Sequence, residues 1–263
     1  MTALNLRPAD AESARFGLRV FRGEGDVFDA HALADALRRD SIDVAIVRIP
    51  ATALASLQAL RDEGFEPIVA DTIVRYAIDL PAGTSNNDAI RLVPASIDDA
   101  ARVEALTRET FAGYLTHYYA NPLFAPAKIL DGYAEWAASH VRDPAAGTIA
   151  WLVEWHGTLA GFSCCRIEKN GALGVGVLNG IVPAFRGRGV YRAMLRRMLL
   201  ELDARGATRF SIATQVQNLT VQRIWATLGF RLDGAQNTIH VNARGAPGAR
   251  AGAEGLERVR DPV

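Results

Sequence analysis

Hydrophobic positions along the chain follow two periods, and each period predicts one kind of element. Short apolar runs bounded by Gly, Pro or polar residues predict strands, whereas apolar residues at every third or fourth position predict amphipathic helices. Between about Ala14 and Leu80, strands and helices alternate in the order FGLRVFRG, AHALADALRRD, DVAIVRI, ATALASLQALRDEG and TIVRYAIDL. The second of these helices is expected to end at Gly64, because glycine is favoured just past a helix C-terminus.

The rest of the chain continues the alternation. IRLVPASIDDAARVEALTRETF predicts a strand and a helix, with Ser96 as the expected cap of the helix. Two strands follow around a turn at His156-Gly157. The remaining elements are, in order, the strand GVGVLNGIV, the helix YRAMLRRMLLELDARG, the strand RFSIATQV, the helix TVQRIWATLG, and two short strands, FRLDG and TIHVN. This order predicts a mixed α/β fold.

Two breaks in composition divide the chain. Residues 81–89 read PAGTSNNDA, which is typical of a linker, and residues 243–263 are rich in Ala, Gly and Arg with little periodicity. We therefore predict a smaller N-terminal αβ half-domain in residues 1–80, a second domain in residues 90–242 and a disordered tail.

A weak internal repeat links the two parts. DVAIVRIPATALASLQALRDEGF and RFSIATQVQNLTVQRIWATLGF both run from a strand through a loop and a helix to Gly-Phe, and a strand opening Thr-Ile follows each. The repeat fits a degenerate copy of the second domain, and it also fits two unrelated strand–helix–strand units. The sequence leaves both interpretations open.

Composition and charge exclude several classes of function. Of the 263 residues, 49% are apolar and 22% charged, and the formal net charge is zero, so nothing global points to nucleic acid or to an anionic membrane. No apolar run approaches the roughly 20 residues of a membrane span, and no secretion signal is visible, so we expect a cytoplasmic protein. The adjacent Cys164 and Cys165 should point to opposite faces of a strand, which makes a disulfide between them unfavourable. No His and Cys spacing indicates a metal site.

The stretch FRGRGVYR, residues 185–192, is the most informative local pattern. A strand, a glycine loop and a helix in this order leave backbone N–H groups free to bind an anion. Gly187 and Gly189 would let the backbone approach a phosphate, because no Cβ intervenes. Arg186 and Arg188 would add charge or would simply be solvated.

Residues 90–242, which contain these motifs, resemble the GNAT family of acetyl-CoA-dependent N-acetyltransferases. IVPAFRGRGVYRAML matches the family's strand, Pro, R-G-x-G and helix pattern, and QNLTVQRIWATLGF matches its Asn, amphipathic helix and Gly-Phe ending. The resemblance implies a central, mostly antiparallel and splayed sheet flanked by helices. It also implies acetyl-CoA as the acyl donor, and no metal.

The resemblance assigns the cofactor site residue by residue. The pyrophosphate would bind the loop formed by Arg186, Gly187, Arg188, Gly189, Val190 and Tyr191. Backbone groups of Ile181 and Val182 would pair with the pantetheine arm like an added strand. Asn218 would hydrogen-bond the same arm, although an Asn at this position also suits the cap of the following helix.

Two positions depart from the family pattern. Tyr191 occupies a position that is usually small, and Trp225 stands where many members have the Tyr that protonates the departing thiolate. An indole N–H is not an acid near neutral pH. Either another group or water would then protonate the thiolate, or the domain would bind CoA without catalysing a reaction. The candidate catalytic residues are Tyr191 and Asn179, which could orient a water or the amine. No residue stands out as the general base.

The acceptor side is expected in residues 111–141, which are rich in aromatic residues. His117, Tyr118 and Tyr119 are the candidate substrate residues, and their rings suit a sugar or a nucleobase. Tyr133 and Trp136 fit better as core positions of an amphipathic helix. Together with the N-terminal half-domain, this stretch resembles the nucleotide-linked amino-sugar acetyltransferases, of which the TDP-fucosamine N-acetyltransferase is one type.

The resulting prediction is an acetyltransferase that moves an acetyl group from acetyl-CoA to a primary amine of a nucleotide-linked amino sugar by direct attack. A peptide, a lysine or an aminoglycoside remains an alternative acceptor, and a catalytically silent CoA-binding module or a binder of other phosphates is an alternative class. The expected partner is a small-molecule amine, with no nucleic acid and no membrane, and a homodimer is possible.

Overall fold

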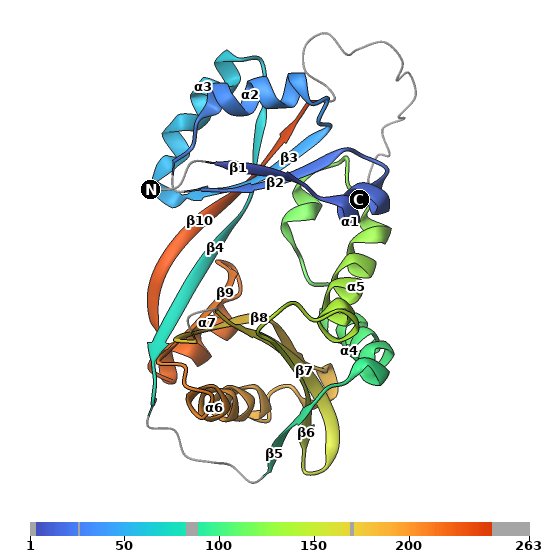
Figure 1. Ribbon diagram of the computed structural model, residues 1–263, viewed down its shortest axis with the longest axis vertical. Coiled ribbons are helices and arrows are strands. Elements are labelled where there is room, and N and C mark those ends of the chain that lie inside the picture. Colours follow the sequence, from blue (N-terminus) through green and yellow to red (C-terminus); the bar gives the residue numbers. More distant parts are fainter. Residues whose placement is uncertain (1–3, 26, 83–88, 169–170, 244–263) are drawn as a thin grey trace, which may run out of the picture. The chain divides into compact units, whose positions relative to one another are not determined.

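The computed structural model describes residues 4–25, 27–82, 89–168 and 171–243 (Figure 1). These residues form two compact units, one from residues 4–68 with 239–243 and the other from residues 69–238. Most of the predicted linker and nearly all of the predicted tail lie outside the described residues.

The first unit is a small sheet with helices. Its strand β1 (Asn5–Pro8) is antiparallel to β2 (Val20–Glu24), and β2 is parallel to β3 (Val44–Pro50). Its helical elements are α1 (Asp10–Phe16), α2 (Ala30–Arg39), the 3-10 helix η1 (Ala51–Ser56) and α3 (Leu57–Asp62). The predicted strands and α2 are confirmed, whereas β1 and α1 were missed. The helix predicted after β3 ends before Gly64 as expected, but its first half is a 3-10 helix.

The first-unit core consists of apolar side chains from α2, α3, β3 and the end of the chain's last strand. Leu33, Leu37, Val47, Leu60, Ile239 and Val241 are among its members and are almost completely buried. The first unit therefore combines residues from both ends of the described chain.

The sheet of the second unit runs in the order β10-β4-β9-β8-β7-β6-β5. Its strands are β4 (Pro67–Asp79), β5 (Ile90–Pro94), β6 (Thr148–Trp155), β7 (Thr158–Ile167), β8 (Leu173–Ile181), β9 (Arg209–Gln215) and β10 (Arg231–Asn242). The neighbours from β5 to β8 pair antiparallel, as do β4 and β9, whereas β8 and β9 are parallel. The predicted mixed α/β fold with a mostly antiparallel sheet is confirmed.

The two short strands predicted at the end of the second domain are wrong. β10 is one continuous strand from Arg231 to Asn242 (Figure 1). The neighbouring strand β4 contacts the middle of β10, where the Thr72 hydroxyl donates a 2.8 Å hydrogen bond to the Asn237 side-chain oxygen. Residues 235–237, which lie between the two predicted strands, are therefore part of the strand itself.

Helices cover both faces of this sheet. α6 (Val190–Asp203, after the 3-10 helix η5, Pro183–Phe185) and α7 (Leu219–Thr227) share one core with the sheet, while α4 (Ala100–Phe111) and α5 (Ile129–Arg142) share another. The α6 core includes Trp151, Cys165, Met194, Met198, Phe210 and Trp225, and the α4–α5 core includes Val103, Leu106, Phe162, Cys164 and Leu178. Adjacent Cys164 and Cys165 thus lie in different cores, which confirms that they face opposite ways.

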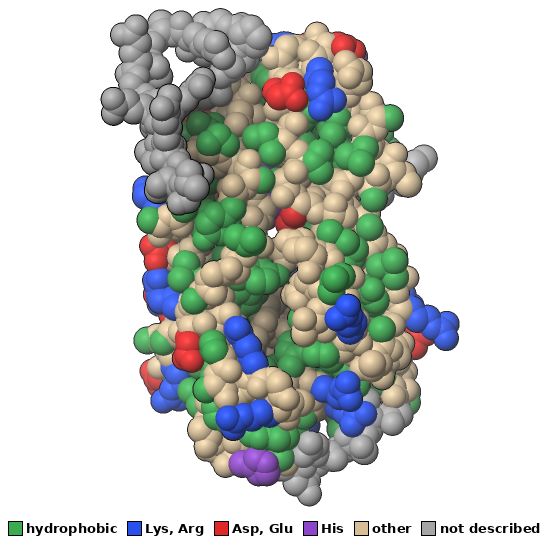
Figure 2. Space-filling model, turned by 180° about the vertical axis from the view of Figure 1, so that it is seen from behind, with side chains coloured by type: hydrophobic (Ala, Val, Ile, Leu, Met, Phe, Trp, Pro, Cys, Tyr) green, Lys and Arg blue, Asp and Glu red, His purple; other side chains and the backbone are tan. Residues whose placement is uncertain are grey.

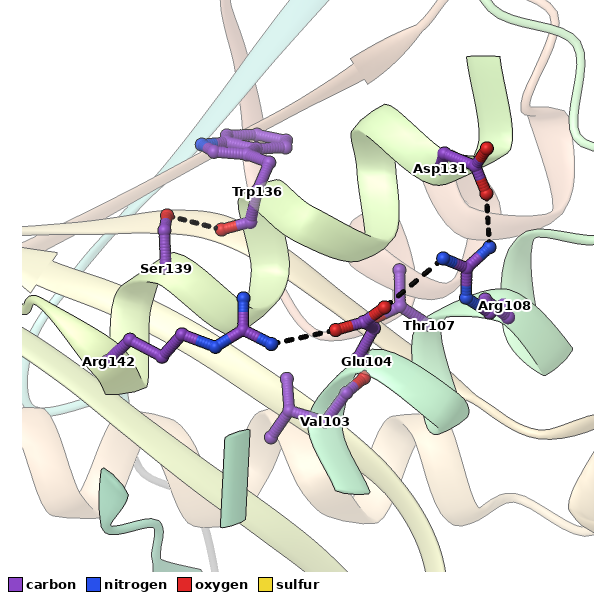
Figure 3. A network of polar contacts seen from close by, with 8 residues as sticks. All are labelled: Val103, Glu104, Thr107, Arg108, Asp131, Trp136, Ser139 and Arg142. Atoms are coloured by element: carbon purple, nitrogen blue, oxygen red, sulfur yellow. Dashed lines mark hydrogen bonds and ion pairs between the residues drawn. The ribbon is translucent and has the colours of Figure 1, made fainter. Parts of the chain in front are cut away.

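Polar contacts join α4 to α5 (Figure 3). The Glu104 carboxylate accepts hydrogen bonds from Arg108, at 3.1 Å, and from Arg142 of α5, at 2.8 Å. Arg108 also donates to Asp131 at the start of α5. Before α4, the 3-10 helix η2 (Ile97–Asp99) begins with the predicted cap at Ser96, whose side chain forms a capping box with Asp99.

Trp136 does not occupy the predicted core position. Its side chain is 43% exposed, and the buried face of α5 is formed by Ala134, Ala137, Ala138 and Val141. Tyr133 does pack partly against the α4–α5 core, as expected.

Candidate active site

The parallel strands β8 and β9 separate part-way along their length. Their pairing runs from Leu173 and Arg209 to Gly176 and Ile212. Both strands continue beyond this point, β8 to Ile181 and β9 to Gln215. We refer to the stretch formed by residues 177–181 and 213–215 as the split.

A β-bulge lies where the split begins. On the other side of β8, Cys165 pairs with Gly176 and Cys164 pairs with Leu178, so Val177 is an extra residue in the β8 strand. A bulge bends its strand and increases the local twist. The bulge therefore accounts for the departure of β8 from β9.

Glycines let the neighbouring elements approach β8 closely. A Cβ on Gly180 would lie 2.3 Å from Thr110 Cγ2 of α4, and a Cβ on Gly161 of β7 would lie 2.1 Å from the Gly180 carbonyl oxygen. A Cβ on Gly176 would lie 2.9 Å from Ile212 Cγ1. Any side chain at these three positions would push β8 out of place, so they fix the geometry of the split.

The backbone of β8 presents alternate residues to the split. The Val182 N–H donates to the Ala160 carbonyl on the β7 side, at 2.9 Å, and the Val182 carbonyl accepts from Phe185, at 3.0 Å. Because strand residues alternate in direction, the N–H and C=O groups of Ile181 and Asn179 face the opposite edge. Of the two residues predicted to pair with pantetheine, Ile181 is the one whose backbone faces the split.

The glycine loop follows β8 and leads into α6. Gly187 and Gly189 have φ values of +73° and +77°, and no heavy atom lies within 4 Å of an added Cβ at either position. Glycine is therefore favoured at both positions because the backbone is left-handed there, and not because space is short. Gly189 is the N-cap residue of α6 and supplies no side chain to it, so the first N–H groups of the helix point toward the exposed loop.

The two loop arginines differ in their contacts. Arg186 donates from Nε to the Ile181 carbonyl, at 3.2 Å, and from Nη2 to the Thr110 carbonyl, at 2.7 Å. Arg186 thus ties the loop to β8 and α4. Arg188 is exposed, and its guanidinium lies 5.8 Å from the Phe185 ring centre.

Tyr191 and Trp225 lie against each other. The indole N–H of Trp225 donates to the Tyr191 hydroxyl at 3.3 Å, and both side chains belong to the α6 core or pack on it. Burial raises the pKa of Tyr191 far above its ordinary value, while the hydrogen bond from Trp225 opposes the shift. The Tyr191 side chain therefore packs beside Trp225, the residue at the position where many GNAT proteins have a Tyr.

Asn218 stands at the start of α7, but its side chain does not cap the helix. Its amide nitrogen donates instead to the Thr214 hydroxyl of β9, at 3.1 Å. The capping interpretation of this residue is thus not observed, and the amide lies beside the end of β9.

Tyr114 bridges the two sides of the split, which the sequence did not reveal. It follows α4 in a turn closed by a 3.0 Å hydrogen bond from the Tyr114 N–H to the Phe111 carbonyl. Its hydroxyl donates to the side-chain oxygen of Gln215, the last residue of β9. Because α4 contacts β8 through Thr110 and Gly180, the Tyr114 side chain reaches from the β8 side to β9.

The three predicted substrate residues lie in one 3-10 helix, η3 (His117–Ala120), but in different surroundings. His117 and Tyr118 are 4% and 8% exposed, and their ring centres are 4.1 Å apart. Tyr119 is 43% exposed. Of the three, only Tyr119 presents a large surface to a ligand in this structure.

The second unit carries basic side chains on its surface. Figure 2 shows Lys and Arg side chains over this unit on one face, with hydrophobic side chains between them. Arg186, Arg188, Arg192 and Arg223 are exposed. The described residues include no group of three or more His, Cys, Asp and Glu placed to hold a metal ion, and none of their helices is long and apolar enough to span a bilayer.

Comparison with known proteins finds a family that part of the chain resembles. Residues 104–230 match the model of the Acetyltransferase (GNAT) family. This segment is similar to the GNAT acetyltransferases. It contains the whole of β8, the glycine loop, Tyr114 and α7.

Solved structures share the fold of the GNAT segment and of much of the remaining chain. A GCN5-related N-acetyltransferase from Sphaerobacter thermophilus is 16% identical over 91% of this chain and 75% of its own, with a TM-score of 0.58. One from Kribbella flavida is 14% identical over 86% and 82%, with a TM-score of 0.56. A tandem GNAT protein from the clavulanic acid biosynthesis pathway is 14% identical over 86% and 75%, with a TM-score of 0.55. A search of curated protein sequences found no match.

Proposed function

We propose that the second unit transfers an acetyl group from acetyl-CoA to a primary amine of a small molecule. One observation carries the proposal: within the segment that matches the GNAT family, β8 leaves β9 at a bulge and runs directly into a glycine loop that opens α6. Similarity to that family supports acyl transfer.

The residues present fit the parts of acetyl-CoA. The N–H groups of residues 187–191 would receive the pyrophosphate at the positive end of the α6 dipole. The backbone of Asn179 and Ile181, which faces the split, would pair with the amides of the pantetheine arm. Asn218 would hydrogen-bond that arm from the β9 side, in exchange for its contact with Thr214.

The acceptor that we propose first is a nucleotide-linked amino sugar. The exposed Tyr119 offers its ring with an apolar face and a hydroxyl, which suits stacking on a sugar. The amine must reach the split in its unprotonated form, because only the free base has a lone pair for attack on the thioester carbonyl.

A catalytically silent CoA-binding module is the second candidate. Trp225 favours it, because the N–H of this side chain is held by Tyr191 and has no acidity near neutral pH. The silent module would bind acetyl-CoA without releasing its thiol in the presence of amines.

Thiol release by the purified protein separates the two candidates. Acetyl-CoA is supplied with a panel of amines that includes TDP-linked amino sugars, a peptide and an aminoglycoside. Burial raises the pKa of Cys164 and Cys165 to about 12, so the protein's own thiols should barely react with a thiol reagent at pH 8. We expect amine-dependent thiol release. Binding without release would favour the silent module, and absence of binding would refute both.

A matched pair of variants tests the loop. Gly189→Glu adds a strained, negatively charged residue at the N-terminus of α6, and we expect it to weaken acetyl-CoA binding at least about tenfold. Gly206→Glu is the control, because Gly206 also has a positive φ and open space around it but follows the other end of α6. Equal affinities of the two variants would show that the loop does not hold the phosphates.

A further inference from the structure

The hydroxyl of Tyr114 lies at the end of β9, one of the two strands of the split. Its ring packs edge-on against Phe111, with ring centres 5.2 Å apart, and its hydroxyl donates to Gln215, which is 7% exposed. Asn218 comes three residues after Gln215, and its side chain contacts Thr214. Tyr114 therefore places an O–H group among the side chains at the end of β9.

The proposed reaction calls for a proton donor near the departing sulfur. When the carbon–sulfur bond of the thioester breaks, its electron pair goes to sulfur, and the thiolate requires a proton to become the neutral thiol. Trp225 cannot supply it, and Tyr191 packs against the α6 core with its hydroxyl hydrogen-bonded to the Trp225 indole. Tyr114 is a phenol that lies outside that core and is only partly buried.

We propose that Tyr114 is the proton donor to the departing sulfur, and thus a catalytic residue of the proposed function on which this inference rests. The hydroxyl gives its proton to sulfur and is left as a phenolate. The phenolate regains a proton from the ammonium group that the attacking amine became on forming its bond to carbon, directly or through water. Protons and electron pairs therefore balance over one turnover without a further reactant.

The surroundings of Tyr114 support both halves of this cycle. Burial, which is the largest influence, raises its pKa, and the Asp71 carboxylate on β4 adds to this effect. The hydroxyl is therefore protonated throughout the neutral range. Hydrogen bonds from Thr214 and Asn218 act in the opposite direction, because they stabilise the phenolate that forms after proton transfer. A thiolate in the same surroundings is also destabilised by burial, which keeps the transfer feasible.

Removal of the Tyr114 hydroxyl tests the role. Tyr114→Phe is compared with Tyr133→Phe, which removes another phenol hydroxyl beside the same Phe111 ring, at a centre distance of 5.5 Å. We expect Tyr114→Phe to lower kcat with acetyl-CoA about 100-fold, in the range of general acid catalysis, and to leave the Kd of acetyl-CoA within about twofold of the wild type. Tyr133→Phe should retain wild-type turnover.

The leaving group provides a readout that a structural role would not change. p-Nitrophenyl acetate releases a phenolate that needs no proton, so with this donor Tyr114→Phe and the wild type should differ by no more than about threefold. An equal loss with both donors, or a parallel loss of acetyl-CoA binding, would assign the hydroxyl to holding β9 and overturn the proposal.

The remaining outcomes also decide. Wild-type turnover with an unaffected Tyr114→Phe variant would refute the role of Tyr114 alone. If the wild type binds acetyl-CoA but turns over no amine, the proposed function fails, and the role of Tyr114 fails with it.

Discussion

At the scale of single residues, glycine serves two different purposes around the split. Gly187 and Gly189 are required by backbone conformation, and the R-G-x-G pattern identifies such residues without a structure. Gly161, Gly176 and Gly180 are required by close contacts with other elements. Those contacts join residues far apart in the chain, so a single sequence cannot reveal which of these glycines is needed.

A double-mutant cycle measures the contact between Gly180 and Thr110. We expect Gly180→Ala to lower the free energy of unfolding by about 1–3 kcal/mol, because the new Cβ would lie 2.3 Å from Thr110 Cγ2. Thr110→Ser removes that methyl group. The double variant should recover most of the loss, as a favourable coupling energy in urea denaturation.

Gly161→Ala serves as the contrast in the same cycle. Its added Cβ would meet the backbone oxygen of Gly180, at 2.1 Å, which no side-chain substitution removes. Recovery of Gly161→Ala by Thr110→Ser would therefore contradict the explanation, as would purely additive effects of Gly180→Ala and Thr110→Ser.

At the scale of elements, the spacing of hydrophobic residues predicted most helices and strands but not the separation of β8 from β9. The strand β8 and the helix α6 follow directly from their apolar patterns. The bulge at Val177 depends on the register between β8 and β7, and that register is set by pairing partners outside the motif. For the same reason the sequence located the glycine loop but did not find Tyr114, whose importance comes from a contact with Gln215 across the split.

The packing of α4 on α5 should depend measurably on pH through Glu104 (Figure 3). Hydrogen bonds from Arg142 and Arg108 lower the pKa of Glu104, so they stabilise the folded state above the ordinary pKa of a glutamate and less as the pH falls below it. Because these groups are partly exposed, we expect Glu104→Gln to cost only about 0.5–1 kcal/mol at pH 7.

The pH dependence distinguishes this interaction from a general effect of the substitution. Urea denaturation at pH 7 and at pH 3 should show the difference between Glu104→Gln and the wild type shrinking at the lower pH. Glu109→Gln, an exposed position on the same helix, should have little effect at either pH. A constant difference for Glu104→Gln would mean that its charge contributes no stability.

At the scale of the whole molecule, each unit has a core of its own, and of the parallel strand pairs β2–β3 and β8–β9 in the described residues, the pair in the second unit forms the split. In the first unit, β2 stays paired with β3 along all of its residues, from Val20 with Val44 to Glu24 with Arg48. The parallel pair β8 and β9 of the second unit separates after Gly176 and Ile212. The proposed acetyl-CoA site is therefore confined to the second unit, which agrees with the absence of an RGRG motif from the first copy of the weak repeat.

Separate cores imply that acetyl-CoA stabilises one unit more than the other. Leu37 of α2 and Met198 of α6 are almost completely buried, in the first-unit core and the α6 core respectively. Replacing either by Ala should destabilise its own unit by about 2–5 kcal/mol. In scanning calorimetry, acetyl-CoA at about 100 times its Kd should add about 2.7 kcal/mol to the free energy of unfolding of the unit that binds it.

We expect Met198→Ala to lower the temperature of the transition that acetyl-CoA raises. Leu37→Ala should lower the temperature of the other transition and retain wild-type affinity for acetyl-CoA. Because β4 and β10 pass through both units, the opposite result has a clear meaning: a single transition, raised by acetyl-CoA and lowered alike by both variants, would show that these strands couple the two cores into one cooperative structure.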